Sequence, residues 1–438
     1  MEQQRETFSS KMGFVMACIG SAIGLGNIWM FPYRLGRYGG AAFLIPYFIF
    51  VLILGTTGLI IEFAFGRGFG GGSMVGIVCV FREKGKRGGR VAGALPAIGL
   101  AGIFMFYNIV IGWILKYFFL SVTGKLGKID KNTYFDSFAG TKQSVPWDML
   151  AIILTVAVIS MGVTKGIERI NKIIMPALFL IFAALAVRSL TLPGAMEGVK
   201  FLLQPDWSCL QRVDTWIMAL GQAFFTVSIN GCGMVVYGSY LKKEYNIPKL
   251  ALTTAVLDTA AALLASFVIM PAVFAFQVDV NAGPPLLFMT MPKIFEQMPG
   301  GSLIAVAFFL SLIFAAISSS INMLEGVTEA IISHTKTGRK KAVVMVGAVM
   351  AVLSLPLNLS MTAFDNFTNL ITVVISPLMV ILVLFVFLYM HGEQEALAEI
   401  NTGAEKKLGK KFIAFAKYVF MAVTVLVVVL GIAYGGIG

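Results

Sequence analysis

The amino-acid sequence predicts an all-α protein that crosses a lipid bilayer many times and forms one domain over residues 1–438. Hydrophobic residues make up 58% of the chain and charged residues only 13%, and the mean hydropathy is +0.86. A water-soluble domain cannot bury that much apolar surface, whereas a bilayer is itself an apolar solvent. Long apolar stretches recur along the whole chain, and no linker or shift in composition divides it.

The apolar stretches predict eleven membrane-spanning helices. A helix needs about 20 apolar residues to cross roughly 30 Å of hydrocarbon. The predicted helices cover residues 12–35, 41–66, 93–121, 148–162, 171–190, 213–241, 250–276, 302–333, 341–358, 366–390 and 412–436, of which the fourth and ninth are short. Residues 281–300 contain Gly-Pro-Pro and Met-Pro pairs and are too polar to span, so we expect a re-entrant or surface hairpin there.

The distribution of basic residues predicts the orientation. If the N-terminus is cytoplasmic, 23 of the 34 Lys and Arg residues lie on the cytoplasmic side, as the positive-inside rule requires. An odd number of helices then gives an extracytoplasmic C-terminus, and we expect a multi-pass protein of the inner membrane. The net charge of +12 reflects these loops. No basic face free of lipid is visible for a nucleic acid.

Two of the predicted helices carry sequences that interrupt a helix. The first contains Gly20–Asn27 (GSAIGLGN), and the sixth contains Phe225–Gly233 (FTVSINGCG). Each interior glycine costs up to about 1 kcal/mol relative to alanine, and Asn and Ser side chains compete for the backbone hydrogen bonds. For one break alone, close helix packing by small residues is an alternative explanation.

The two breaks lie five helices apart, which predicts an inverted repeat. The first repeat would cover about residues 12–190 and the second about 213–390, with an extra helix at about 412–436. Matching breaks in two halves are typical of transporters whose binding site lies near the bilayer midplane between the repeats.

An unwound segment exposes main-chain amides and carbonyls at membrane depth. Each exposed group costs several kcal/mol unless a ligand, an ion or a side chain completes it. The amides of Leu25 and Gly26 open the outer half of the first helix, and such an end favours a carboxylate. Carbonyls on the other side of the break suit a cation or an ammonium group, so the site could hold both ends of a zwitterion.

Asp258 is the strongest single indication of function. It lies near the middle of the seventh predicted helix, where a carboxylate costs about 2.5–3.5 kcal/mol on insertion scales. Intramembrane carboxylates are usually functional, so Asp258 is a candidate cation ligand or proton carrier, although a hydrogen-bonded structural role remains open. Glu62, Glu325 and Glu329 lie nearer the helix ends, and for them structural and functional roles are equally open.

Three consecutive serines, Ser318–Ser320, follow in the eighth predicted helix. Serines in such helices often bond back to a preceding carbonyl of their own helix. Near an unwound segment they also offer hard oxygen ligands, which suit Na⁺ better than any soft metal.

Five motifs in order resemble the signature of the neurotransmitter:sodium symporters. They are Gly20–Pro32 (GSAIGLGNIWMFP), Gly39-Gly40 with Pro46, Glu62–Arg67 (EFAFGR), Gly221–Thr226 (GQAFFT) and Ser318–Ser320. The resemblance covers nearly the whole chain and is greatest to bacterial eleven-helix members such as a sodium-dependent tyrosine transporter. It implies sodium-coupled import of an amino acid and no enzymatic activity.

The resemblance also implies the ligands of two sodium ions and of the substrate. The first sodium would lie among Ala22, Asn27, Thr226, Asp258 and the substrate carboxylate. The second would lie among Gly20, Ile23, Ala315, Ser318 and Ser319. The substrate carboxylate would meet the amides of Leu25 and Gly26 and the hydroxyl of Tyr107, and its ammonium the carbonyls of Ala22, Phe225 and Thr226, near Ser228. Its side chain would contact Ile103, Phe225, Ser228, Gly231, Ser319 and Met323.

Several gate positions depart from the family pattern. Met30 stands where many relatives have the arginine of the outer gate, and Phe8 replaces a tryptophan after Arg5. Ser333 takes the place of the inner-gate aspartate, so Arg5 needs another partner, with Tyr240 as a candidate helper.

Two further substitutions suggest hypotheses about specificity. Asp258 replaces a common asparagine, and its fixed charge, together with Ala262 in place of a hydroxyl, predicts that no chloride is required. Gly231 stands where a bulky aromatic often lines the pocket, which predicts room for tyrosine or another aromatic amino acid. A proton-coupled carrier of the same architecture, using Asp258, is the alternative.

Overall fold

The computed structural model describes residues 6–278, 285–335 and 337–436, and these residues contain helices and no strand. The first half comprises α1 (Lys11–Ala22), η1 (Gly26–Met30), α2 (Phe31–Arg37), η2 (Gly40–Phe43), α3 (Leu44–Phe50), η3 (Val51–Gly55), α4 (Thr56–Phe69), α5 (Ser73–Glu83), α6 (Gly89–Val122), η4 (Leu126–Lys128), α7 (Tyr134–Phe138), α8 (Val145–Ser160), η5 (Val163–Glu168) and α9 (Arg169–Leu190). Arg5 lies outside the described residues, as do residues 281–284 of the predicted hairpin.

The second half begins at α10 (Ala195–Leu203) and η6 (Trp207–Gln211). It continues with α11 (Val213–Thr226), α12 (Gly233–Ser239), α13 (Ile247–Ala275), η7 (Leu286–Thr290), α14 (Met291–Gln297), α15 (Gly301–His334), α16 (Arg339–Asn358), α17 (Met361–Asn369), η8 (Leu370–Ile375), α18 (Ser376–Phe385), η9 (Val386–His391), α19 (Glu393–Asn401), α20 (Lys410–Ala414), η10 (Phe415–Phe420) and α21 (Met421–Tyr434).

The membrane-spanning character of these helices agrees with the predicted fold class. Among the described residues, eight continuous helices are long and apolar enough to cross a bilayer, and the bent pair α1 and α2 makes nine. Helix α8 is apolar but has only 16 residues, and α11 and α12 are separated by a six-residue break. The count of eleven spanning helices therefore stays a prediction that depends on α8 and on the pair α11 and α12.

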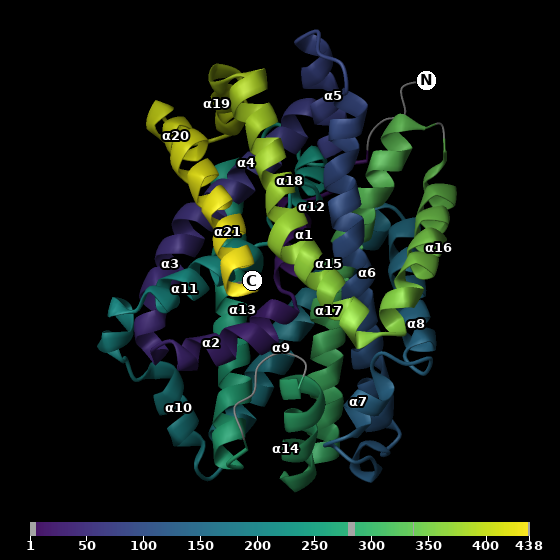
Figure 1. The fold of residues 1–438 in the computed structure, drawn as a ribbon, viewed down its shortest axis with the longest axis vertical. Helices are drawn as coiled ribbons and strands as arrows, with labels where there is room; N and C mark the ends of the chain where they lie inside the picture. The colour runs from purple at the N-terminus through teal and green to yellow at the C-terminus, as the bar shows by residue number, and fades with distance from the viewer. Residues whose placement is uncertain (1–5, 279–284, 336, 437–438) are drawn as a thin grey trace.

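The molecule is an elongated bundle with α6 and α15 packed against each other, as Figure 1 shows. The outer surfaces of the spanning helices carry exposed apolar side chains, such as Ile153 on α8, Leu180 on α9 and Val352 on α16. Helix α14 lies at the end of the bundle opposite the N-terminus, beside α7 (Figure 1). It forms a short helix at that end and not a span.

Helix ends follow ordinary capping chemistry. The Ser10 side chain accepts a hydrogen bond from the amide of Gly13 at the start of α1, and Asn246 does the same for Lys249 at the start of α13. Gly70 ends α4 in the left-handed conformation, with φ +58°. These local signals fix where the helices begin and end.

Candidate substrate and sodium sites

The first helix is interrupted where the sequence predicts a break. Helix α1 ends at Ala22, the chain resumes helical structure at Gly26, and the two segments are bent by 58° relative to each other. The Gly24 amide donates to Asn27 Oδ1 at 3.2 Å, and the Leu25 amide donates to the Tyr107 hydroxyl at 3.4 Å. The break thus presents amides on its outer side, next to Tyr107.

The second break separates α11 from α12, again as the sequence predicts. Ser228 and Gly231 both have positive φ, +56° and +74°, so the chain cannot continue as a helix there. The Asn230 side chain accepts from the amides of Cys232 (3.0 Å) and Gly233 (2.8 Å) and caps α12. The Ser228 hydroxyl donates to the Ser21 carbonyl at 2.7 Å, which joins the two breaks directly.

Glu62 of α4 accepts hydrogen bonds from two further amides of the second break. Its Oε1 atom accepts from the amides of Asn230 (3.0 Å) and Gly231 (2.7 Å). The sequence left the role of Glu62 open, and the structure gives it a supporting one. The EFAFGR motif marks Glu62 as a family residue, but the motif alone does not indicate which segment of the chain the Glu62 carboxylate contacts.

Three side chains predicted to bind the first sodium converge at the two breaks. Asn27 Nδ2 donates to Asp258 Oδ1 at 2.8 Å and to Thr226 Oγ1 at 3.1 Å, and Thr226 Oγ1 donates to Asp258 Oδ2 at 2.7 Å. All three residues are buried. Asp258 is therefore a buried carboxylate facing both broken helices, and its oxygens and the Thr226 hydroxyl are hard oxygen ligands of the kind that suit sodium.

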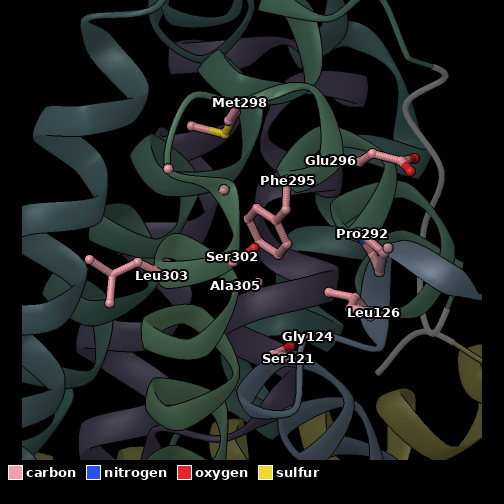
Figure 2. A pocket seen from close by; sticks show the side chains of 13 residues that line it. Ser121, Gly124, Leu126, Pro292, Phe295, Glu296, Met298, Ser302, Leu303 and Ala305 are labelled. Carbon is pink, nitrogen blue, oxygen red and sulfur yellow. The ribbon is translucent and has the colours of Figure 1, made fainter.

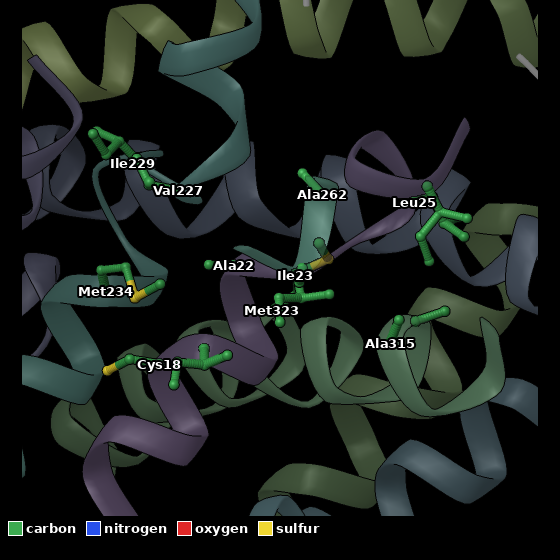
Figure 3. Packing of buried hydrophobic residues seen from close by; sticks show 14 of the residues in the cluster. Cys18, Ala22, Ile23, Leu25, Val227, Ile229, Met234, Ala262, Ala315 and Met323 are labelled. Atoms are coloured by element: carbon green, nitrogen blue, oxygen red, sulfur yellow. The ribbon is translucent and has the colours of Figure 1, made fainter. Parts of the chain in front are cut away.

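The predicted second site is equally compact. The Ser319 hydroxyl lies 3.2 Å from the carbonyl oxygens of Gly20 and Ser21 and 3.3 Å from those of Ile23 and Ala315. A hydroxyl carries one proton, so it can satisfy only one of four acceptors at a time. Such a cluster of oxygens is electron-rich and suits a small hard cation. Figure 3 shows Ile23 of the break near Met323 of α15.

The two other serines of the run have different partners. Ser318 Oγ bonds back to the carbonyls of Phe314 (2.9 Å) and Ala315 (2.8 Å) of its own helix. Ser320 Oγ lies 2.9 Å from Thr155 Oγ1 and donates to Asn108 Oδ1 at 3.1 Å. Ser318 therefore shows the bond to its own helix that is common for such serines, whereas a sodium-ligand role for this run stays a prediction.

Open space adjoins the first break. A Cβ atom added to Gly26 would meet no atom within 4 Å, although the surrounding main chain is at membrane depth. Several predicted pocket residues are half-buried, namely Gly26, Ile103, Tyr107, Phe225 and Ser228. Met323 and Ser319 are buried. The residues expected to contact a substrate therefore include both half-buried and buried side chains.

The prediction that Gly231 enlarges the pocket is wrong for this structure. A Cβ atom added to Gly231 would lie 2.6 Å from the carbonyl oxygen of Met379 and 3.1 Å from the amide of Val380. The main chain of α18 therefore fills the space that the missing side chain leaves. The glycine allows helix packing and a positive φ, and it does not hold space open for a ligand.

Near the start of α1, aromatic and charged residues pack together at the predicted inner end of the bundle. The Phe8 ring is fully buried and packs edge-on against Phe14 and Tyr237, with centroids 5.4 and 5.8 Å apart. The Tyr240 hydroxyl donates to Glu325 Oε1 at 2.5 Å, and Arg339 Nη2 donates to Glu325 Oε2 at 2.5 Å.

Arg339 belongs to this network although the sequence does not indicate it. Nothing in the sequence pairs the first residue of α16 with Glu325, fourteen positions earlier on α15. Because Arg5 lies outside the described residues, its partner at the inner gate stays a prediction.

At the outer side, Met30 is half-buried and carries no charge for a gate. One turn further along α2, buried Arg34 donates from Nη1 to Gln222 Oε1 of α11 at 3.1 Å. The polar contact between the two outer helix halves therefore involves Arg34 and not residue 30.

A separate cavity of about 520 Å³ lies at the opposite end of the molecule from the N-terminus. It is formed by the end of α6, α14 and the start of α15, with Phe295 and Met298 in its wall (Figure 2). None of the predicted substrate or sodium residues lines it. It is therefore distinct from the site between the breaks.

Comparison with known proteins agrees with this geometry. The sequence model of the sodium:neurotransmitter symporter family matches residues 5–138 and 136–435. The uncharacterised sodium-dependent transporter YhdH of Bacillus subtilis is 37% identical over 430 residues, covering 94% of this chain and 93% of that protein. The uncharacterised sodium-dependent transporter MJ1319 of Methanocaldococcus jannaschii is 32% identical over 429 residues, covering 93% and 86%.

A solved structure has the same fold. The crystal structure of MhsT in complex with L-phenylalanine superposes with a TM-score of 0.84 at 34% sequence identity, covering 98% of this chain and 99% of that one. The family model and the relatives describe transporters and not enzymes. The chain therefore belongs to the sodium:neurotransmitter symporter family and is a multi-pass, sodium-dependent membrane transporter.

Proposed function

We propose that this protein imports an aromatic or large hydrophobic amino acid, with tyrosine as the leading candidate, together with two sodium ions and without chloride. The observation that carries the proposal is the meeting of Asn27, Thr226 and Asp258 at the junction of both broken helices. A cation at that point would join both broken helices, so binding it would order them. The alternative of a proton at Asp258 is less favoured, because the family is sodium-dependent.

The substrate would bind beside the first sodium. Its carboxylate would meet the amides of Leu25 and Gly26 and the Tyr107 hydroxyl, which already accepts from Leu25. Its ammonium would face the carbonyls of Ala22, Phe225 and Thr226. Because the carboxylate would also complete the sodium shell, each ligand must raise the affinity for the other.

Support for an aromatic side chain comes from the partial exposure of the predicted pocket residues Ile103, Phe225 and Ser228 and from the open space next to Gly26. The solved relative MhsT is described with L-phenylalanine bound. Gly231 does not support an aromatic substrate, because the main chain of α18 fills the space that a side chain at this position would occupy.

The ions would drive transport by alternating access. Sodium and substrate would bind from outside, and rocking of the two repeats would close the outer side. Release to the inside would then require the segment around Phe8 and the Tyr240–Glu325–Arg339 network to open. We infer an inner-membrane location with a cytoplasmic N-terminus, since the N-terminus and the basic segments beside α5 and α20 lie at the same end of the bundle (Figure 1).

The test is uptake into liposomes containing the purified protein, screened over the twenty amino acids with an imposed sodium gradient at equal pH on both sides. We expect tyrosine or another aromatic amino acid to be taken up fastest, and only with sodium. Leucine or alanine competing better than tyrosine and tryptophan would contradict the substrate class. Uptake driven by a proton gradient without sodium would contradict the coupling ion.

A second arm of the same assay tests the chloride hypothesis. The fixed charge of Asp258 would balance the sodium charge without an anion, so replacing chloride by gluconate should leave the uptake rate unchanged. A collapse of uptake in gluconate would show that the carboxylate does not serve this role.

A further inference from the structure

Arg67 ends the EFAFGR motif, and the proposed transport cycle gives it no role. It lies in the last turn of α4, and its side chain is only 1% exposed. A buried guanidinium must be surrounded by acceptors, because leaving its donors without partners is costly. The acceptors around Arg67 therefore show which segments of the chain it holds together.

The guanidinium of Arg67 joins three segments of the chain. Its Nε donates to Glu399 Oε1 at 2.6 Å, and Nη1 donates to the carbonyl of Tyr245 at 2.7 Å. Its Nη2 donates to the carbonyls of Glu399 (2.5 Å) and Thr402 (3.0 Å). Lys243 Nζ donates to the second carboxylate oxygen of Glu399 at 2.6 Å. The end of α4, the loop between α12 and α13, and the end of α19 thus meet at one residue.

Helix α4 and the inner half of the sixth helix, α12, form one packed unit. A Cβ atom added to Gly66 would lie 1.8 Å from the Val235 carbonyl, and one added to Gly238 would lie 2.6 Å from Cα of Phe63. Their main chains are therefore in direct contact, and neither can move far without the other.

The predicted tenth helix, which comprises α17, η8, α18 and η9, contacts the unit of α4 and α12 at two places, once directly and once through α19. The first contact is between the main chain of α18 at Met379 and Gly231, which lies in the second break just before α12. The second contact is made by α19, which follows η9 after one residue. Glu399 of α19 forms the ion pair with Arg67 of α4. A movement of α12 must therefore either carry the tenth helix with it or break the Arg67 junction.

We propose that Arg67 is a positioning residue for transport, which couples the tenth helix through α19 to the inner half of the sixth helix so that they open the inner pathway together. The inference rests on the proposed alternating-access cycle. It assigns a function to the charge triad Arg67, Glu399 and Lys243, which touches neither the substrate nor a sodium ion.

The experiment uses Cys232, a buried residue in the second break, as a native reporter of inner opening. The other three cysteines, Cys18, Cys79 and Cys209, are replaced by serine, and the rate of maleimide labelling is measured in sodium without substrate. Arg67→Gln and Glu399→Gln should each raise the labelling rate roughly tenfold, because each breaks a largely buried ion pair. The maximal uptake rate should fall, while the sodium concentration for half-maximal uptake stays at the wild-type value.

The matched control is Glu393→Gln. Glu393 lies in the first turn of the same helix α19, and its carboxylate is 2.5 Å from Lys417 Nζ. The change therefore removes an ion pair of α19 that does not involve Arg67. It should leave labelling and uptake unchanged, and Lys243→Gln, at the exposed corner of the triad, should have an intermediate effect. If Arg67→Gln does not fold, Glu399→Gln carries the test, since glutamine can still accept from Arg67.

Wild-type labelling and uptake rates in Glu399→Gln, or an equal effect of Glu393→Gln, would overturn the coupling role. A failure of the proposed function looks different. In that case the wild-type protein itself would show no sodium-dependent amino-acid uptake.

Discussion

Single residues decide which polar groups of this membrane protein face the candidate sodium sites. Ser319 lies within 3.3 Å of four carbonyl oxygens, three of them from the broken first helix. Ser320, its neighbour, turns about 100° around the helix axis and meets Asn108 instead. Ser319 thus lies at the candidate sodium site, whereas Ser320 joins its helix to a neighbouring helix.

Ser319→Ala should raise the sodium concentration for half-maximal uptake at least tenfold, because it removes one oxygen ligand and leaves four carbonyls without a hydroxyl. A tenfold change corresponds to about 1.4 kcal/mol. Ser320→Ala is the matched control and should change this value less than twofold. Sodium titration of uptake in liposomes measures both variants, and equal effects would contradict the assignment.

Asp258→Asn should weaken sodium binding roughly tenfold or more, since the variant can still accept from Asn27 and can donate to the Thr226 hydroxyl but loses the negative charge. The measurement is sodium-dependent binding of labelled tyrosine to purified protein. Asp148→Asn is the control, because Asp148 is equally buried but bonds Ser354 and Asn358 of α16, away from the breaks. A sodium titration of Asp258→Asn that matches wild type would remove Asp258 from the first sodium site.

At the scale of elements, residues elsewhere in the chain contact both breaks, and at the first break Tyr107 of α6 accepts a hydrogen bond from the Leu25 amide. Glu62 of α4 accepts two amides of the second break, and Asn230 caps the helix that follows. Helix α18 packs against Gly231, whose φ of +74° is strained for any residue with a side chain. The breaks are therefore built into the fold before any ligand binds.

Gly231→Ala should destabilise the protein strongly, because the new Cβ would lie 2.6 Å from the Met379 carbonyl in addition to the strained φ. Gly70→Ala isolates the second effect, since Gly70 also has a positive φ, +58°, but open space around it. We expect Gly70→Ala to cost about 1–2 kcal/mol and Gly231→Ala clearly more. Thermal unfolding of the purified variants in detergent tests this order, and equal stabilities would contradict the packing argument.

At the scale of the whole molecule, the proposed cycle would combine a zwitterionic substrate of no net charge with a net inward movement of positive charge. Each positive charge that enters gains about 2.3 kcal/mol per 100 mV of membrane potential. Two sodium ions would contribute about 4.6 kcal/mol, which permits roughly a thousandfold accumulation before the sodium concentration gradient is counted.

Uptake should therefore be electrogenic. An inside-negative potassium diffusion potential, set with valinomycin across the liposome membrane, should increase tyrosine accumulation at a constant sodium gradient. Collapse of the potential with equal potassium on both sides is the control. Accumulation that does not respond to the potential would indicate that a compensating charge moves outward in each cycle.

The sequence by itself determined the class of fold, the places where two helices break, and the presence of a buried carboxylate. Apolar length, glycine and asparagine runs, and the cost of Asp258 in a membrane are local properties, so they can be read without the fold. The five motifs also indicated the family, and with it Asn27, Thr226 and Ser319 as site residues.

Only the tertiary structure decided which segments complete those breaks. Glu62 and the second break are 168 residues apart, and Arg67 and Glu399 are 332 apart, so no local pattern links them. The same limit explains the wrong prediction for Gly231, because the absence of a side chain does not say whether a ligand or another helix fills the space. Long-range packing makes that choice, and it depends on the whole bundle.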